Sequence, residues 1–270
     1  FQVPVSSGAS QIEVRTRSFD DVSLQTIATS ESFVAPIQSK MINADDGLAG
    51  YVWSDLNGND QWDVGESGIP DLTVRLLDQD DNPLALSVNH DPDPYDDSVV
   101  LNGQYAGVQI AAVGTHILNT NVYSRPDGRA STGDRVFANF NAGTNSVVQT
   151  WGADSRTLRM TFDTPQSAVS IEAIADDAGD VARLEAYDSQ GGLLERITSE
   201  ALENGETVRL SLTRPAADIA YVIARAHYNT EVLLDNLIVG ADSETLTGSQ
   251  GEFRFGGLPA GGYRIEAVPD

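Results

Sequence analysis

The chain has no cysteine and one lysine, Lys40, among its 270 residues. The lack of cysteine excludes disulfide bonds, thiolate metal sites, iron–sulfur clusters and cysteine nucleophiles. The single lysine leaves one candidate for lysine-based catalysis or for a covalent Lys–Asn cross-link. No apolar run approaches the roughly 18 residues of a membrane span, and no signal peptide is visible. We therefore expect a soluble segment of a longer protein.

Positive charge is also scarce. Sixteen Lys and Arg residues stand against 40 Asp and Glu, which gives a formal net charge of −24. A chain this acidic repels phosphate backbones and anionic membranes, so we expect no nucleic-acid partner and no direct membrane insertion. It attracts hard cations that prefer carboxylate oxygen. Hydrophobic residues make up 40% of the chain, which is enough to build a core and argues against wholesale disorder.

Catalytic motifs are missing as well. The three histidines, His90, His116 and His227, are scattered and form no His-Glu-x-x-His pattern. The sequence has no Gly-x-Ser-x-Gly elbow and no phosphate-binding loop. A glycosidase needs only two facing carboxylates, but with 40 acidic residues no pair stands out. We predict that the protein is not an enzyme.

What the sequence does contain is a series of short runs with apolar and polar residues in alternation. Examples are residues 11–15, 72–77, 158–162, 169–174 and 207–212. This period of two places one face of a strand in a core and the other in water. Turn residues such as Asp127-Gly128 and Asn204-Gly205 separate the runs. The pattern predicts an all-β protein made of sandwiches or jelly rolls.

The predicted strands fall into unequal parts. We expect a short β segment at 1–29, a linker at 30–46, a unit that begins at Gly47, and a long strand-rich block inserted into that unit. Residues 19–24 resemble residues 234–239. Either this is a coincidence between two amphipathic strands, or residues 1–29 are the tail of a preceding copy of the module.

The most specific motif is the acidic loop at residues 55–66. Oxygen donors stand at loop positions 1, 3, 5, 7, 9 and 12: Asp55, Asn57, Asn59, Gln61 through its backbone carbonyl, Asp63 and Glu66. This spacing wraps a calcium ion, with the last Glu closing the site. The usual Gly at position 6 is replaced by Asp60, which tolerates a left-handed turn better than most residues. Because strand patterns flank the loop, we expect a β-hairpin site; the alternative is a polar hairpin loop without metal.

Residues 50–59, 63, 66–70 and 74–76, together with the Gly- and aromatic-rich end at 251–265, resemble the SdrD B-type repeat of bacterial surface adhesins. That repeat is related to the collagen-adhesin B-type fold. The resemblance implies a discontinuous β-sandwich at 47–90 plus 246–270, with the calcium ligands in the 55–66 loop. Some relatives carry a Lys–Asn isopeptide bond, but Lys40 lies before the matched region, so we expect none.

The block at 91–245 resembles the jelly-roll domains of carbohydrate-binding modules. The resemblance rests on the pattern of strands and turns and not on a specific motif. The resemblance implies a structural calcium between first and last strands, held by Asp235 with Asp96 or Asp97. The alternative is that the acidic run at 91–97 is a solvated linker of like charges. We therefore expect the fold class of the chain to be all-β, with an SdrD B-like β-sandwich and an inserted β-jelly-roll domain.

A sugar site would use exposed aromatic rings and polar groups. The candidates in apparent turns are Tyr123, Trp151, Tyr228 and His227. Tyr187 and Tyr221 alternate with apolar neighbours and are expected in the core, while Trp53 and Trp62 are expected to pack around the calcium loop.

These features together predict a non-catalytic, calcium-stabilised extracellular module of a bacterial surface protein, acting in adhesion or as a rigid structural repeat. The alternative is a carbohydrate-binding module that presents a jelly-roll glycan site. The expected partners are calcium, a polysaccharide or a cell-surface protein, and neighbouring repeats in a longer chain.

Overall fold

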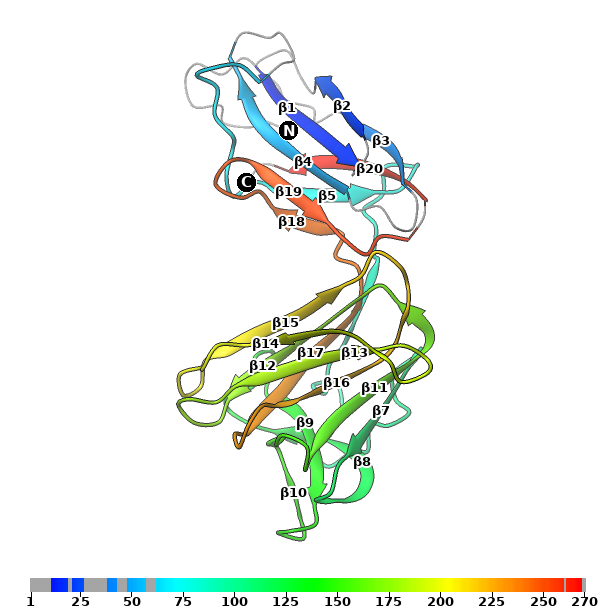
Figure 1. Cartoon of the computed structure of the whole chain (residues 1–270), viewed down its shortest axis with the longest axis vertical. Coiled ribbons are helices and arrows are strands. Elements are labelled where there is room, and N and C mark those ends of the chain that lie inside the picture. Colours follow the sequence, from blue (N-terminus) through cyan, green and yellow to red (C-terminus); the bar gives the residue numbers. More distant parts are fainter. Residues whose placement is uncertain are drawn as a thin grey trace. The chain divides into compact units, whose positions relative to one another are not determined.

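The computed structural model describes residues 11–18, 21–26, 38–42, 48–56, 62–259 and 261–268. All regular secondary structure in these residues is β-strand, which confirms the expected all-β class (Figure 1). Within the same residues, no helix is long and apolar enough to cross a membrane.

The chain divides into two compact units. Residues 1–87 and 241–270 form the first, which we call the split unit, and Val88–Gly240 form the second, which we call the inserted unit. The inserted block was expected at 91–245, a few residues from this division.

The split unit contains two four-stranded sheets. One has the order β19 (Glu252–Phe255), β4 (Leu48–Asp55), β1 (Gln11–Ser18) and β2 (Asp21–Thr26); the other has the order β18 (Glu244–Leu246), β5 (Thr73–Leu77), β20 (Gly261–Val268) and β3 (Gln38–Ile42). β1 pairs antiparallel with β4, and β3 pairs with β20. The described strands of the expected 1–29 segment, β1 and β2, therefore lie in the sheet of β4, and β3, from the expected 30–46 linker, lies in the sheet of β5 and β20. Short alternating strands with few residues gave too weak a pattern to show which sheet they join.

Alternation builds the core of the split unit as the sequence predicts. The buried apolar side chains come from strands of both sheets: Leu48, Val52, Val74, Leu76, Phe253, Phe255, Ile265 and Ala267. Gly251 lies where a segment crosses β4 at close range, with φ of 75°. A Cβ there would stand 2.0 Å from the Val52 carbonyl oxygen, so only glycine fits.

The inserted unit is built from a seven-stranded and a five-stranded sheet. The first has the order β10 (Ser146–Val148), β9 (Arg135–Asn141), β17 (Val232–Gly240), β12 (Ala168–Ala175) and β15 (Thr207–Thr213), with β6 (Ser87–His90) paired to β17 and β8 (Ile117–Pro126) to β9. The second has the order β14 (Leu193–Thr198), β13 (Ala182–Tyr187), β16 (Ile219–Ala226), β11 (Thr157–Gln166) and β7 (Val108–Val113).

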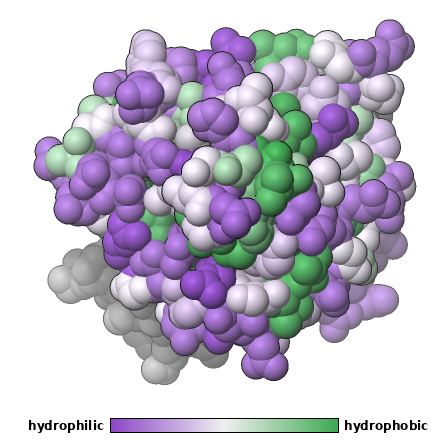
Figure 2. Space-filling model, turned by 90° about the horizontal axis from the view of Figure 1, so that it is seen from below, coloured by the Kyte–Doolittle hydropathy of each residue, from purple (hydrophilic) through white to green (hydrophobic). Residues whose placement is uncertain are grey.

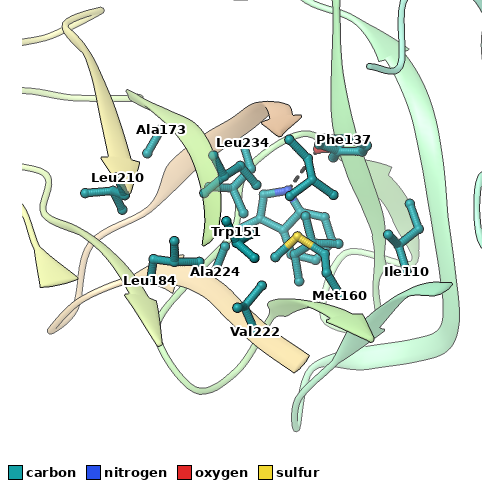
Figure 3. Close-up of a cluster of buried hydrophobic side chains, with 14 of the residues drawn as sticks. Ile110, Phe137, Trp151, Met160, Ala173, Leu184, Leu210, Val222, Ala224 and Leu234 are labelled. Atoms are coloured by element: carbon teal, nitrogen blue, oxygen red, sulfur yellow. Dashed lines mark hydrogen bonds between the residues drawn. The ribbon is translucent and has the colours of Figure 1, made fainter. Parts of the chain in front are cut away.

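One continuous apolar core joins these two sheets. Figure 3 shows side chains of both sheets around Trp151, including Phe137, Met160, Val222 and Leu234. Outside the core, the surface in the view of Figure 2 is mostly hydrophilic, and apolar residues form narrow strips rather than a broad patch.

Candidate functional site

The two ends of the predicted calcium loop lie together in the split unit. Asp55 is fully buried at the end of β4. The Glu66 carboxylate accepts hydrogen bonds from the backbone N–H of Leu56 and of Asp63, both at 2.9 Å. Glu66 therefore ties the start of the loop to its end.

The middle of this loop, with Asn57, Asn59 and Gln61, lies outside the described residues. Within the described part of the chain, no three Asp, Glu or His side chains are grouped so that they alone could hold a metal ion. The described side chains fit calcium by chemistry, because Asp55, Asp63 and Glu66 supply hard carboxylate oxygens at neighbouring points of one loop. A full site needs the amide and carbonyl donors between them.

Aromatic rings pack beside the same loop. Trp53 and Trp62 stack with ring centroids 5.7 Å apart and an angle of 4° between the planes, and Tyr51 meets Trp62 edge-on at 5.3 Å. The indole N–H of Trp62 donates to the Glu66 carbonyl at 3.1 Å. Trp62 thus holds the C-terminal end of the loop against Trp53 on β4.

The predicted second calcium site is not assembled as expected. The exposed side chain of Asp97 pairs with Arg125, whose Nη1 lies 3.1 Å from both carboxylate oxygens. Asp96 is exposed. Asp235 is fully buried on β17 and accepts hydrogen bonds from the backbone N–H groups of Ser131 and Thr132 and from the Ser131 hydroxyl.

The carboxylates near Asp235 are different members of the acidic run. The Thr132 hydroxyl donates to Asp91 at 2.6 Å and also contacts Asp235 at 3.4 Å, so Thr132 links these two acids. Burial, and to a smaller extent the charge of Asp91, raises the pKa of Asp235 to about 6. Burial also raises the pKa of Asp93, where Asp91 adds to the effect. Asp91 is therefore the acid that repels both Asp93 and Asp235.

The predicted sugar-binding aromatics divide into three cases. Trp151 is fully buried and its indole N–H donates to the Phe137 carbonyl at 2.9 Å (Figure 3), so the prediction of an exposed platform is wrong. Tyr123 is half-buried on β8, with Asn119 and Asn121 bonded to its hydroxyl. Tyr228 is 74% exposed.

Two tyrosines assigned to the core lie instead on the outer face of the five-stranded sheet. In β13, β16 and β11 the residues Leu184, Val222 and Met160 point into the core, so their strand neighbours project outward. Tyr187 and Tyr221 are directly opposite on β13 and β16, and their rings stack at 4.8 Å with 7° between the planes. Both are half-buried.

Charged side chains share this outer face. Glu185 is 3% exposed and lies among three arginines, with Arg196 Nε at 2.6 Å, Arg225 Nε at 3.3 Å and Arg183 Nη1 at 3.9 Å. Burial alone would raise the pKa of Glu185, but Arg225 and Arg196 outweigh it, and the pKa is lowered. Glu185 is therefore held as a carboxylate that fixes the three guanidinium groups in place.

The same face continues to the end of β16. Arg183 Nη2 lies 2.8 Å from Nε2 of His227, whose ring is 3.8 Å from that of Tyr228. Burial, then the charges of Arg183 and Arg225, lower the pKa of His227 and keep the ring neutral near pH 7. Tyr228 has φ of 56°, a left-handed conformation that is uncommon for a bulky side chain.

Sequence reasoning missed this face because alternation shows which residues share a side of a strand, not which side is buried. Arg183, Glu185 and Tyr187 alternate with Ala182, Leu184 and Ala186, and the small alanines made the tyrosines look like the larger core residues. The outward run of Arg, Glu and Tyr was the available signal.

Comparisons with protein-family models and with curated proteins found no match. Among solved structures, the chain is similar to the CBM22-1–GH10 modules of endo-1,4-β-D-xylanase 10B from Clostridium thermocellum, complexed with xylohexaose. The TM-score is 0.36 at 9% identity, covering 58% of this chain and 29% of that chain, so this chain spans less than a third of that structure's length. It is also similar to the K3 cleaved adhesin domain of Lys-gingipain from Porphyromonas gingivalis, with TM-score 0.31, 12% identity, 58% of this chain and 99% of that chain. A third similar structure is CBM29-2, a family 29 carbohydrate-binding module, with TM-score 0.32, 9% identity, 57% of this chain and 91% of that chain.

Proposed function

We propose that the inserted unit binds carbohydrate through the outer face of its five-stranded sheet. The observation that carries the proposal is the set of polar and aromatic side chains fixed on this face by their own contacts: Tyr187, Tyr221, Glu185, Arg183, Arg196 and Arg225. Sugar hydroxyls need donors and acceptors that are already in position, since ordering long side chains on binding costs affinity. Strands of a packed sheet supply that rigidity.

Tyr228 completes the face at one end. The stacked pair leaves little open ring surface, because Tyr187 covers one side of Tyr221 and the Arg159 guanidinium lies 3.8 Å from the centroid of the same ring. Tyr228 is 74% exposed, so it offers ring surface for the apolar side of a sugar. Its left-handed backbone costs about 1 kcal/mol or more, and strain of this kind gathers at binding sites.

The split unit has a supporting role in this proposal. Its 55–66 loop would hold a structural calcium through Asp55, Asn57, Asn59, Gln61, Asp63 and Glu66, as the SdrD B resemblance implies. Calcium would neutralise carboxylates that otherwise repel one another in a chain of net charge −24. A rigid, calcium-stabilised unit that carries a glycan-binding insert would act in adhesion on a bacterial surface, without catalysis.

Glycan retention tests the proposal. The wild-type chain would be run through gels that each contain one of a panel of neutral and acidic polysaccharides. For each polysaccharide that retards the chain, the affinity would be measured by titration calorimetry. Tyr228→Ala should weaken binding about tenfold, because stacking a sugar on a ring contributes on the order of 1 kcal/mol or more. Leu118→Ala is the matched control, since Leu118 is 57% exposed on β8 of the other sheet and loses similar surface.

Equal binding by Tyr228→Ala and wild type would remove Tyr228 from the site. No retention of wild type on any polysaccharide would refute the glycan proposal and leave the rigid structural repeat as the remaining function.

A further inference from the structure

The outer face of the five-stranded sheet differs in charge from the rest of the chain. Its outward strand positions hold four arginines, Arg159, Arg183, Arg196 and Arg225, and two carboxylates, Glu185 and Asp163. Asp154, in a neighbouring loop, adds a third carboxylate, which pairs with Arg225 at 2.8 Å. These seven residues together carry a net charge of +1, whereas the whole chain carries −24.

The arginines around Glu185 also repel one another. Burial, then the charges of Arg196 and Arg225, lower the pKa of Arg183. One buried carboxylate thus stands against three guanidinium groups, and the exposed Asp154 offsets only part of the surplus. A ligand that brought negative charge to this face would relieve the repulsion.

Arg159 is the arginine of this face without a carboxylate partner. Its guanidinium lies over the Tyr221 ring, with Cζ 3.8 Å from the ring centroid, and its Nε donates to the Thr161 hydroxyl at 3.2 Å. Among the described residues no carboxylate forms an ion pair with it. These two contacts hold the guanidinium in place, while both terminal nitrogens keep N–H groups to donate.

A guanidinium held in this way suits a carboxylate. Its two parallel N–H bonds match the two oxygens of one carboxylate, and holding the side chain beforehand reduces the entropy lost on binding. The net charge of the chain does not forbid an anionic ligand, because charges more than about 8 Å away are largely screened at physiological ionic strength. The local arginines therefore decide which ligands can bind.

We propose that this face selects acidic polysaccharides, with Arg159 binding the carboxylate of a hexuronate residue. The inference rests on the proposed glycan-binding function and names the ligand class for the same site. Tyr221 positions the Arg159 guanidinium, and the Arg183, Arg196 and Arg225 cluster favours further negative charge along the bound chain.

The test compares an acid with its neutral ester. Short oligogalacturonates and the same oligosaccharides with methyl-esterified carboxyls are titrated into the full chain by calorimetry at physiological ionic strength. Wild type should bind the acid at least tenfold more tightly than the ester, since a hydrogen bond to a charged group contributes more than one to a neutral group. Arg159→Gln should lose about tenfold in affinity for the acid and keep the affinity for the ester.

Two further variants separate geometry from charge. Arg159→Lys keeps the charge but loses the paired N–H geometry, so it should fall between wild type and Arg159→Gln. Arg125→Gln removes the same charge from β8, where Arg125 pairs with Asp97, and should bind the acid as wild type does. Thermal melts of each variant show whether the fold is retained.

Equal affinity of wild type for acid and ester would overturn the inference, as would acid binding by Arg159→Gln within about twofold of wild type. Retention on neutral polysaccharides alone would leave the proposed function standing and refute this ligand class. Retention on no polysaccharide would refute both.

Discussion

Removing the buried carboxylate of the arginine cluster should destabilise the inserted unit strongly. In Glu185→Gln, Arg183 loses its carboxylate partner and Arg225 keeps only the exposed Asp154, while the two arginine side chains are only 13% and 12% exposed. Removing one partner of a buried ion pair costs about 3–5 kcal/mol, because the other charge is left uncompensated. We expect the lower part of this range, since Arg196, with 43% of its side chain exposed, can turn to solvent.

The pH dependence has a definite sign. The folded pKa of Glu185 is lowered from an ordinary value of 4.5. A lowered acid pKa stabilises the fold fully above the ordinary pKa, and that stability is lost as pH falls through the folded pKa. The difference between wild type and Glu185→Gln should therefore be constant near pH 7 and shrink below about pH 4.5.

Calorimetric melts give the measurement. The inserted unit has 240 − 88 + 1 = 153 residues, and for this size 1 kcal/mol shifts Tm by about 2–4 °C. Glu185→Gln should thus lower one transition by roughly 6–12 °C, from a loss of about 3 kcal/mol. Glu195→Gln is the control, because Glu195 makes only a 4.0 Å contact with Arg214 and is 41% exposed. A shift of Glu185→Gln no larger than that of Glu195→Gln would refute the reasoning.

Two further predictions concern a core residue and the loop. Trp151→Ala should destabilise the inserted unit by about 3–5 kcal/mol in chemical denaturation, because it empties the centre of the core; a loss below about 1 kcal/mol would contradict that placement. Wild type should melt at a lower temperature with chelator than with calcium. Asp55→Ala should lose most of that difference in melting temperature, whereas Asp80→Ala, in an exposed turn, should keep it. No effect of chelation on the melting temperature of wild type would refute the calcium loop.

Much of the architecture follows from local sequence patterns. The alternating runs at 158–162, 169–174 and 207–212 each lie in a strand. A β-strand places every second side chain on the same face, so it buries the apolar residues of such a run together. The insertion was expected because residues 50–76 and 251–265 resemble parts of one repeat and flank a long block with a different strand pattern. These are properties of neighbouring residues, which a sequence shows directly.

Trp151 shows what such patterns miss. It lies between Thr150 and Gly152, which reads as a turn, yet it forms an isolated bridge with Val232, eighty-one residues later, and its ring fills the core. The pairing partner decides whether the ring faces solvent or the interior, and nothing in residues 150–152 specifies that partner. The acidic run shows the same limit: Asp91 and Asp93, not Asp97, reach the surroundings of Asp235 because Thr132 and Gly133 meet them there.

The insertion has a consequence for the order of folding. β5 pairs with β18 and β4 with β19, so the sheets of the split unit close only after the 153 residues of the inserted unit have been made. Closing so long a loop is entropically costly while the chain is unfolded. Within the inserted unit, however, its first strand β6 pairs with its last strand β17, which brings the two ends of the insert together. Once the insert has folded, it acts as a short loop, and the strands on either side meet as if they were neighbours in sequence.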